Sequence, residues 1–271
     1  MPVFDMALCA SLVRELTTIS VAAAQAIRRS NWERDGVRMK GDASPVTAAD
    51  EAAEAVIADG LARLEPVLPV ISEERAERET PAIEGRSFFL VDPLDGTREF
   101  IAGRSEYTIN IGLICEGSPI LGVIAAPALG LIWRGIVGRG AERLEFSERE
   151  TSPPKAIRAA RSRPEQELRV MVSRSHLDAQ TQAYLDGLRN AQSVPCGSSV
   201  KFCRLAEGAA DLYPRFAATR DWDVAAGHAI LAAAGGGVVT PDGAALTYGS
   251  PPLRIPAFLA AGDPTLLSVR R

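Results

Sequence analysis

The sequence predicts a mixed protein with an α+β first half and an α/β second half. Two patterns support this assignment. Between residues 87 and 137, short apolar segments follow one another with Gly and Pro between them, which is typical of an antiparallel meander. After residue 168, short apolar segments alternate with helical patterns, which is typical of an α/β layer. The length of 271 residues fits one large domain or two small ones.

Two helices are expected near the N-terminus. Apolar residues recur at three- and four-residue steps over residues 8–27, so this segment should form an amphipathic helix that packs on a core. Residues 31–45 are polar and contain Gly, so we expect a loop there. A second helix is expected over residues 48–64, because Pro66 follows closely.

Short apolar segments predict five strands in the first half. The first two strands each end in acidic residues, and a charged connection separates them. The expected strands are residues 67–71, 87–91, 107–115, 120–126 and 131–137.

The second half is expected to begin after a subdomain boundary. Residues 138–168 are rich in Arg, Glu, Pro and Ser, so we divide the chain into subdomains at residues 1–140 and 155–271. The expected strands are residues 169–173, a segment near Ser193, and residues 211–214. The expected helices are residues 177–188, 199–207 and 222–234, the last of which ends at three glycines.

Composition and charge exclude several classes of protein. The formal net charge is -4, which is too weak to indicate a nucleic-acid polymer or a polybasic membrane contact. Apolar runs stay shorter than about 18 residues, and Asp5, Arg14 and Glu15 interrupt the N-terminus, so we expect no transmembrane segment and no signal peptide. The four cysteines form no CxxC pair, which favours a reducing, cytoplasmic compartment.

Acidic side chains follow two of the predicted strands. Glu73 and Glu74 follow the first strand, and Asp92 and Asp95 follow the second. Converging carboxylates repel one another, and a divalent cation with oxygen ligands relieves the repulsion, for which Mg²⁺ is well suited. Local sequence alone leaves a surface turn as the alternative, because Asp-Pro-Leu-Asp-Gly contains strong turn formers.

Gly96 and Thr97 come directly after these acids. We expect them to open a helix whose free N–H groups face an anion. A cation on one side and a helix N-terminus on the other would together bind a phosphate group.

Asp50 and Asp223 each have two interpretations. The segment from Thr47 to Asp50 has the spacing of a capping box, which on local sequence is the favoured role of Asp50. Asp223 lies in the first turn of the last helix, where an acidic residue is favourable. Its functional interpretation is a further metal ligand, contributed by the second half.

Two segments resemble the signatures of the inositol monophosphatase superfamily. Residues 91–101 (Val-Asp-Pro-Leu-Asp-Gly-Thr-Arg-Glu-Phe-Ile) are similar to the first signature, and residues 222–228 (Trp-Asp-Val-Ala-Ala-Gly-His) to the second. The segments that resemble the 3'(2'),5'-bisphosphate nucleotidase branch of this superfamily are residues 44–50, 72–74, 173–176, 197–203 and 206–215. The branch usually has Lys at Arg98 and Thr at Val224, neither of which is a ligand position.

The resemblance implies a five-layered αβαβα sandwich of the sugar-phosphatase type. It implies hydrolysis of a phosphomonoester by metal-activated water, with about two or three Mg²⁺ ions and inhibition by Li⁺. The implied metal ligands are Glu73, Asp92, Asp95, Asp223 and the carbonyl of Leu94. The implied catalytic residues are Glu73, Thr97, which would bind the attacking water, and Asp50, which would accept a hydrogen bond from Thr97.

The same resemblance implies a nucleotide pocket. Ser173 and His176 would contact the nucleoside, and Ser198 and Lys201 would contact the second phosphate or the ribose. On local sequence, His176 is equally well explained as a surface residue at a helix start. The implied substrate-binding residues are Leu94, Asp95, Gly96, Thr97, Ser173, His176, Ser198, Lys201 and Asp223.

The expected substrate is a small phosphomonoester, first of all adenosine 3',5'-bisphosphate, which would be hydrolysed to AMP and phosphate. The pathway role implied by the resemblance is the removal of this by-product of sulfate assimilation. An inositol monophosphatase or a broader sugar phosphatase stays open, because it would use the same carboxylates. A non-catalytic regulator that binds metal and nucleotide is the remote alternative. A homodimer, a peripheral association with the inner membrane, and a redox role for Cys196 and Cys203 also stay open.

Overall fold

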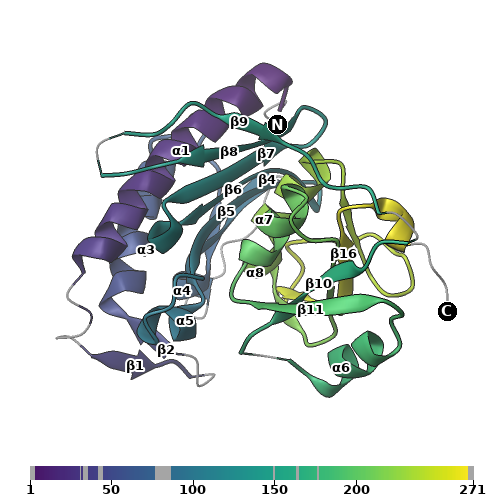
Figure 1. Cartoon of the computed structure of the whole chain (residues 1–271). Coiled ribbons are helices and arrows are strands. Elements are labelled where there is room, and N and C mark those ends of the chain that lie inside the picture. The colour runs from purple at the N-terminus through teal and green to yellow at the C-terminus, as the bar shows by residue number, and fades with distance from the viewer. Residues whose placement is uncertain are drawn as a thin grey trace.

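The computed structural model describes residues 4–30, 32, 36–41, 45–76, 87–148, 150–162, 165–175 and 177–267. These residues form five layers (Figure 1): a helix pair, a seven-stranded sheet, a second helix pair, a five-stranded sheet, and a short outer helical layer. The predicted αβαβα sandwich is therefore confirmed.

The first layer contains the two helices that the sequence predicts at the N-terminus. Helix α1 (Met6–Arg29) begins where the Asp5 side chain accepts a hydrogen bond from the Leu8 N–H at 2.8 Å. Its buried side packs with α3 (Ala48–Leu61) onto one face of the larger sheet. Within the described residues α1 is also the one helix long and apolar enough to cross a membrane by length and composition, a test that buried core helices pass too.

The seven-stranded sheet forms the second layer, with its strands in sequence order from β3 to β9. Its strands are β3 (Val70–Ser72), β4 (Ser87–Asp95), β5 (Thr108–Cys115), β6 (Ser118–Ala126), β7 (Leu131–Ile136), β8 (Gly140–Glu145) and β9 (Lys155–Ile157). All neighbours are antiparallel except β3 and β4, which run parallel.

The polar composition of two segments hides strands that the sequence analysis missed. Strands β8 and β9 lie inside residues 138–168, so the first sheet extends past the expected boundary. Strands β1 (Val37–Met39) and β2 (Pro45–Thr47) pair antiparallel; β1 lies within the predicted loop and β2 begins at its last residue, so the prediction of a loop is wrong over these strand residues. Strand β1 is exposed along its length and has only three residues, so its Val-Arg-Met alternation is too short to mark a strand. The division into two subdomains stays a prediction.

The third layer lies between the two sheets and consists of α7 (Val200–Ala206) and α8 (Asp221–Ala233). Helix α8 approaches the larger sheet at a row of three glycines that pair directly across β5, β6 and β7: Gly112, Gly122 and Gly135. A Cβ atom on Gly122 would lie 2.3 Å from the Ala226 carbonyl oxygen of α8, so only glycine permits this approach.

The fourth layer is a five-stranded sheet in the order β11-β10-β12-β16-β14. Its strands are β10 (Leu168–Ser173), β11 (Ala191–Cys196), β12 (Leu212–Arg215), β14 (Gly237–Val239) and β16 (Phe258–Ala261). The pairs of β10 with β11 and β12 are parallel, as the alternation of strands and helices predicts, but both pairs of β16 are antiparallel. The outer layer contains α6 (Ala179–Asp186) and the 3₁₀ helix η2 (Pro264–Leu267).

The glycine row makes a testable prediction about stability. Gly122→Ala should lower the free energy of unfolding by about 1–3 kcal/mol, because the added methyl group overpacks the contact between α8 and the sheet. Gly41→Ala is the matched control, since nothing lies within 4 Å of its Cβ position. Chemical denaturation of both variants measures the effect, and equal stability of the two would contradict this account of the layer contact.

Candidate active site

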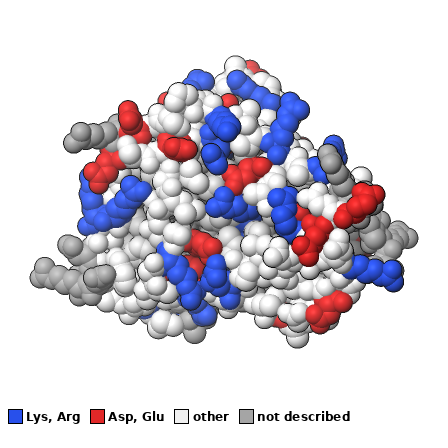
Figure 2. Space-filling model, viewed as in Figure 1, with Lys and Arg blue, Asp and Glu red and all other residues white. Residues whose placement is uncertain are grey.

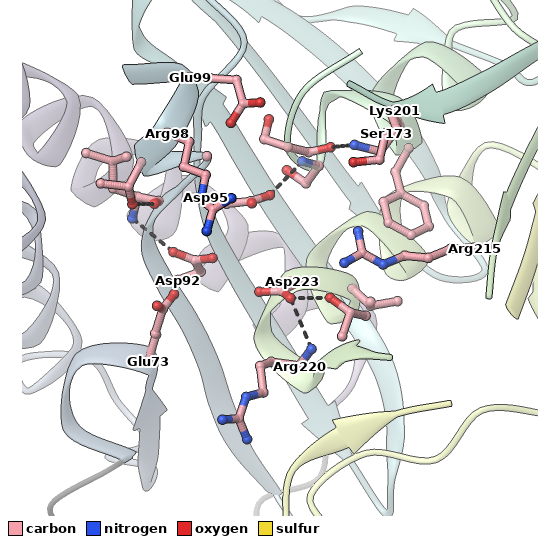
Figure 3. A pocket seen from close by; sticks show the side chains of 18 of the residues that line it. Glu73, Asp92, Asp95, Arg98, Glu99, Ser173, Lys201, Arg215, Arg220 and Asp223 are labelled. Atoms are coloured by element: carbon pink, nitrogen blue, oxygen red, sulfur yellow. Dashed lines mark hydrogen bonds between the residues drawn. The ribbon is translucent and has the colours of Figure 1, made fainter. Parts of the chain in front are cut away.

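A cavity of about 440 Å³ opens where the ends of β4 and β10 meet the first turns of α7 and α8 (Figure 3). It is lined by residues from both halves of the chain. The lining residues that carry the argument below are Glu73, Asp92, Leu94, Asp95, Gly96, Thr97, Arg98, Glu99, Ser173, Ser198, Lys201, Arg215, Arg220, Asp223 and Arg254.

The end of β4 supplies two carboxylates. Asp92 pairs with Asn110 across the strands and is almost fully buried. The register shifts between Asp92 and Asp95, which directs both carboxylates into the cavity (Figure 3). Asp95 Oδ2 accepts a hydrogen bond from the Ser199 N–H at 2.6 Å, where α7 begins.

Gly96 follows in the left-handed conformation at φ +91°, which permits the sharp turn into helix α5 (Thr97–Ile101). The predicted helix after Gly96 is present, with five residues.

Glu73 comes from the start of α4 (Glu73–Ala76), directly after β3, and is paired with a lysine. Lys40 Nζ lies 2.6 Å from Glu73 Oε1 and 2.7 Å from Glu74 Oε1. Burial lowers the pKa of Lys40, but the two glutamates raise it overall, so the ammonium stays charged.

Asp223 comes from the first turn of α8, in the second half of the chain. Its Oδ2 accepts hydrogen bonds from the Arg220 N–H at 3.0 Å and from the Thr219 hydroxyl. The Asp223 carboxylate therefore accepts a hydrogen bond in the first turn of α8, which is the role that the local sequence predicts. It also reaches the cavity (Figure 3).

Three carboxylates meet closely in the cavity. One oxygen each of Glu73, Asp92 and Asp223 lies within 4.8 Å of the others, a spacing that can hold a metal ion. Burial, and then the neighbouring carboxylates, raises the pKa of Glu73 to about 7 and places the pKa of Asp92 well above its usual range. Burial and Asp223 likewise raise the pKa of Asp95 to about 6. Hard oxygen donors that repel one another fit a divalent cation such as Mg²⁺.

Thr97 and Asp50 are joined by a hydrogen bond beside this cluster. Thr97 Oγ1 lies 3.2 Å from Asp50 Oδ1 and 3.2 Å from the Leu94 carbonyl oxygen. Asp50 Oδ2 accepts bonds from the N–H and the hydroxyl of Thr47, which completes the capping box of α3. Each oxygen of the carboxylate thus has its own role, so Asp50 both caps the helix and contacts Thr97.

Three of the four residues expected to bind the nucleotide line the cavity, on the wall across from the carboxylates. Ser173 and Ser198 line the cavity at the ends of β10 and β11. Lys201 is only 2% exposed, and its ammonium donates hydrogen bonds to the carbonyls of Cys196 (3.2 Å) and Ser198 (2.6 Å). His176 lies outside the described residues.

Glu106, which lies just before β5 of the larger sheet, bonds to the segments that follow β10 and β11. It makes a two-pronged ion pair with Arg174, at 2.9 Å and 3.0 Å, and accepts the Gly197 N–H at 2.9 Å. A Cβ atom on Gly197 would lie 2.7 Å from the Glu106 carbonyl oxygen, so glycine is needed for this contact. The two strand ends that carry Ser173 and Ser198 are thereby held together.

Sequence reasoning missed four cationic residues of this site. Lys40 is one of only three lysines in an arginine-rich chain, and that scarcity was the available signal. Arg215 lies in a segment that carried the family resemblance, but no role was assigned to it; its guanidinium donates to the Tyr213 hydroxyl at 3.3 Å. Arg220 and Arg254 are far apart in sequence, and only the fold brings them to one cavity.

The fold and the site define a class of protein. The chain matches the inositol monophosphatase family over residues 12–267 and belongs to that family. The resemblance on which the sequence analysis relied is confirmed.

Similar proteins narrow the branch of the family to which the chain is related. The 3'(2'),5'-bisphosphate nucleotidase CysQ of Escherichia coli (strain K12) is 46% identical over 213 residues, which cover 77% of this chain and 81% of that protein. The protein of the same name from Shigella flexneri has the same identity and coverage. The crystal structure of CysQ from Bacteroides thetaiotaomicron, a bacterial member of this family, is 32% identical, with a TM-score of 0.77, and the match covers 93% of this chain and 97% of that one.

The raised pKa values predict a pH-dependent effect of Mg²⁺ on stability. The folded state keeps protons on Glu73, with a pKa of about 7, that the unfolded chain releases near 4.5, so the metal-free protein should lose stability as the pH rises between these values. Mg²⁺ should therefore raise Tm more at about pH 7.5 than at about pH 5. Thermal unfolding with Mg²⁺ or EDTA at both pH values tests this. An equal Mg²⁺ effect at both would contradict the assignment of these carboxylates to the cation.

Proposed function

We propose that this chain is a Mg²⁺-dependent 3'(2'),5'-bisphosphate nucleotidase that hydrolyses adenosine 3',5'-bisphosphate to AMP and phosphate. The observation that carries the proposal is the meeting of Glu73, Asp92 and Asp223 beside the Thr97–Asp50 pair, in a cavity lined by cationic side chains. Its relatives named 3'(2'),5'-bisphosphate nucleotidase support the choice of substrate.

Glu73, Asp92 and Asp223 would hold Mg²⁺, with Asp95 and the Leu94 carbonyl as further ligands. When bound, the metal supplies a Lewis acid that activates water and neutralises phosphate charge. Occupancy by about two or three ions and inhibition by Li⁺ belong to this proposal.

The chain's own part in the reaction is to orient water. The Thr97 hydroxyl has one proton, and when it donates this proton to Asp50 its lone pairs are free to accept a hydrogen bond from water. Asp50 is itself fixed by Thr47, so its Oδ1 is held in place as an acceptor for the Thr97 hydroxyl before substrate binds. The amides of Gly96 and Thr97 would hold phosphate oxygens at the start of α5.

The substrate's remaining groups would lie along the wall formed by Ser173, Ser198 and Lys201, with His176 assigned to the same wall by resemblance alone. Lys201 already donates to two carbonyls, and one of its three N–H groups is left for the substrate. Arg215 adds a second cation between this wall and Asp223 (Figure 3).

Inositol phosphate hydrolysis is the second candidate, because the chain belongs to the inositol monophosphatase family and the carboxylate cluster would serve any small phosphomonoester. A regulator that only binds metal and nucleotide has no need of the Thr97–Asp50 pair.

The proposal also concerns partners and compartment. The proposed substrate is a small molecule. Figure 2 shows acidic and basic side chains interspersed on the face in view, whereas a nucleic-acid polymer would call for a continuous basic patch. All four cysteines are free thiols, which agrees with the reducing cytoplasm. Association with a membrane surface and a homodimer stay open.

Side-by-side assays test the substrate. With Mg²⁺, phosphate release from adenosine 3',5'-bisphosphate should exceed release from inositol 1-phosphate, and Li⁺ should suppress it. Asp92→Asn should lower kcat at least about 100-fold, because it removes a carboxylate from the cation site. A preference for inositol 1-phosphate would discard the nucleotide assignment, and full activity of Asp92→Asn would discard the cation site.

A further inference from the structure

Two turns that would bind different parts of the substrate touch each other in the cavity. One is the turn of residues 95–97, the phosphate turn, which leads into α5 and would hold the hydrolysed phosphate. The other is the turn of residues 197–199, the wall turn, which joins β11 to α7 and carries Ser198. A Cβ atom on Gly96 would lie 3.3 Å from the Ser198 Cβ atom. The spacing of these two turns therefore sets how far apart two groups of one substrate can bind.

The connection that precedes β5 lies against both turns at Glu106. A Cβ atom on Gly96 would lie 3.1 Å from the Glu106 carbonyl oxygen, and a Cβ atom on Gly197 would lie 2.7 Å from the same oxygen. Glycine at both positions permits this close approach, because it has no Cβ atom. The two turns thus share one backbone contact, although they belong to different halves of the chain.

The Glu106 side chain holds the wall turn in place. Its carboxylate accepts two hydrogen bonds from Arg174, at 2.9 Å and 3.0 Å, and one from the Gly197 N–H at 2.9 Å. Arg174 also donates to the Pro195 carbonyl at 2.9 Å, so the ion pair extends to the end of β11. Burial acts to raise the pKa of Glu106, but the hydrogen bonds from Arg174 and Gly197 lower it overall. The carboxylate therefore stays charged, which strengthens each of these bonds.

The wall turn needs such support because Ser198 is strained. Its φ of +46° lies in the left-handed region, which a residue other than glycine adopts only where the surrounding structure fixes it. Lys201 donates to the Ser198 carbonyl at 2.6 Å, and Glu106 accepts the N–H of the residue before Ser198. Loss of the Glu106 carboxylate should let the turn relax, which would move Ser198 relative to Gly96.

We propose that Glu106 is a positioning residue that sets the spacing between the phosphate turn and the wall turn. It would thereby select substrates that bind both turns over those that bind the phosphate turn alone. Within the described part of the chain Glu106 does not line the cavity, so it would act through Gly197 and Arg174 rather than by touching the substrate. The proposal rests on the proposed function, in which a bisphosphorylated nucleoside binds both turns.

The test compares Glu106→Ala and Arg174→Gln with wild type on adenosine 3',5'-bisphosphate. The KM should rise about tenfold in Glu106→Ala, because three hydrogen bonds to a charged group are lost. It should rise less in Arg174→Gln, which keeps the bond from the Gly197 N–H. The kcat should stay close to that of wild type in both variants, because the carboxylate cluster and the Thr97–Asp50 pair are unchanged.

Glu142→Gln is the matched control. It breaks a comparable ion pair, in which Arg134 lies 2.7 Å from Glu142, and neither residue lines this cavity. Its KM should equal that of wild type. This variant separates the loss of an ion pair as such from the loss of the contact that positions the wall turn.

Calorimetric titration supplies a readout that does not depend on turnover. AMP, whose 5'-phosphate would lie at the wall turn, should bind Glu106→Ala about tenfold more weakly than wild type. Inorganic phosphate with Mg²⁺, which would bind at the phosphate turn, should bind both proteins alike. An equal loss of affinity for AMP and phosphate would overturn the positioning role, because it would indicate general damage to the cavity.

The two proposals fail in different ways. If wild type releases no phosphate from the bisphosphate, the proposed function is wrong. If wild type is active and both variants keep wild-type KM and AMP affinity, only the positioning role is wrong. Arg174 is exposed, so Arg174→Gln keeps the test valid should Glu106→Ala fail to fold.

Discussion

The close approach of α8 to the seven-stranded sheet is the constraint on which the site depends. Gly112, Gly122 and Gly135 lie side by side across three strands, so the helix backbone rests directly on the strand backbones. This contact fixes the height of the helix above the sheet, and its first turn carries Asp223. Asp223 can therefore reach within 4.8 Å of carboxylates that belong to the other half of the chain.

The resulting cluster opposes the stability of the fold that holds it. Asp92 is buried, and its neighbours Glu73, Asp95 and Asp223 carry the same charge, so all the resolved shifts in this group raise the pKa. Lys40 compensates only one side of the cluster, where it contacts Glu73. A cation bound among these groups would remove both repulsion and proton uptake, which couples ligand binding to folding. Strain of this kind is typical of functional sites.

Much of the fold was predictable because its signals are local. Amphipathic periodicity marks α1, and apolar runs mark β5, β6 and β7 within about two residues. The acidic residues that line the cavity could also be singled out, because acids at strand ends and two family motifs are features of contiguous sequence. Strands β8 and β13 (Thr219–Arg220) were missed, since β8 is rich in charged residues and β13 has only two residues. The pairing of Arg220 with Arg254 and the ion pair of Lys40 with Glu73 join distant segments, so no local pattern encodes them.

The central claim is that α8 brings Asp223 into one cation site with Glu73 and Asp92. Anomalous diffraction from crystals grown with Mn²⁺ tests it most directly, because the metal position is observed independently of activity. The account predicts an anomalous peak within coordination distance of oxygens from all three residues. A peak that contacts Glu73 and Asp92 but leaves Asp223 uncoordinated, or one that lies elsewhere in the molecule, would contradict it.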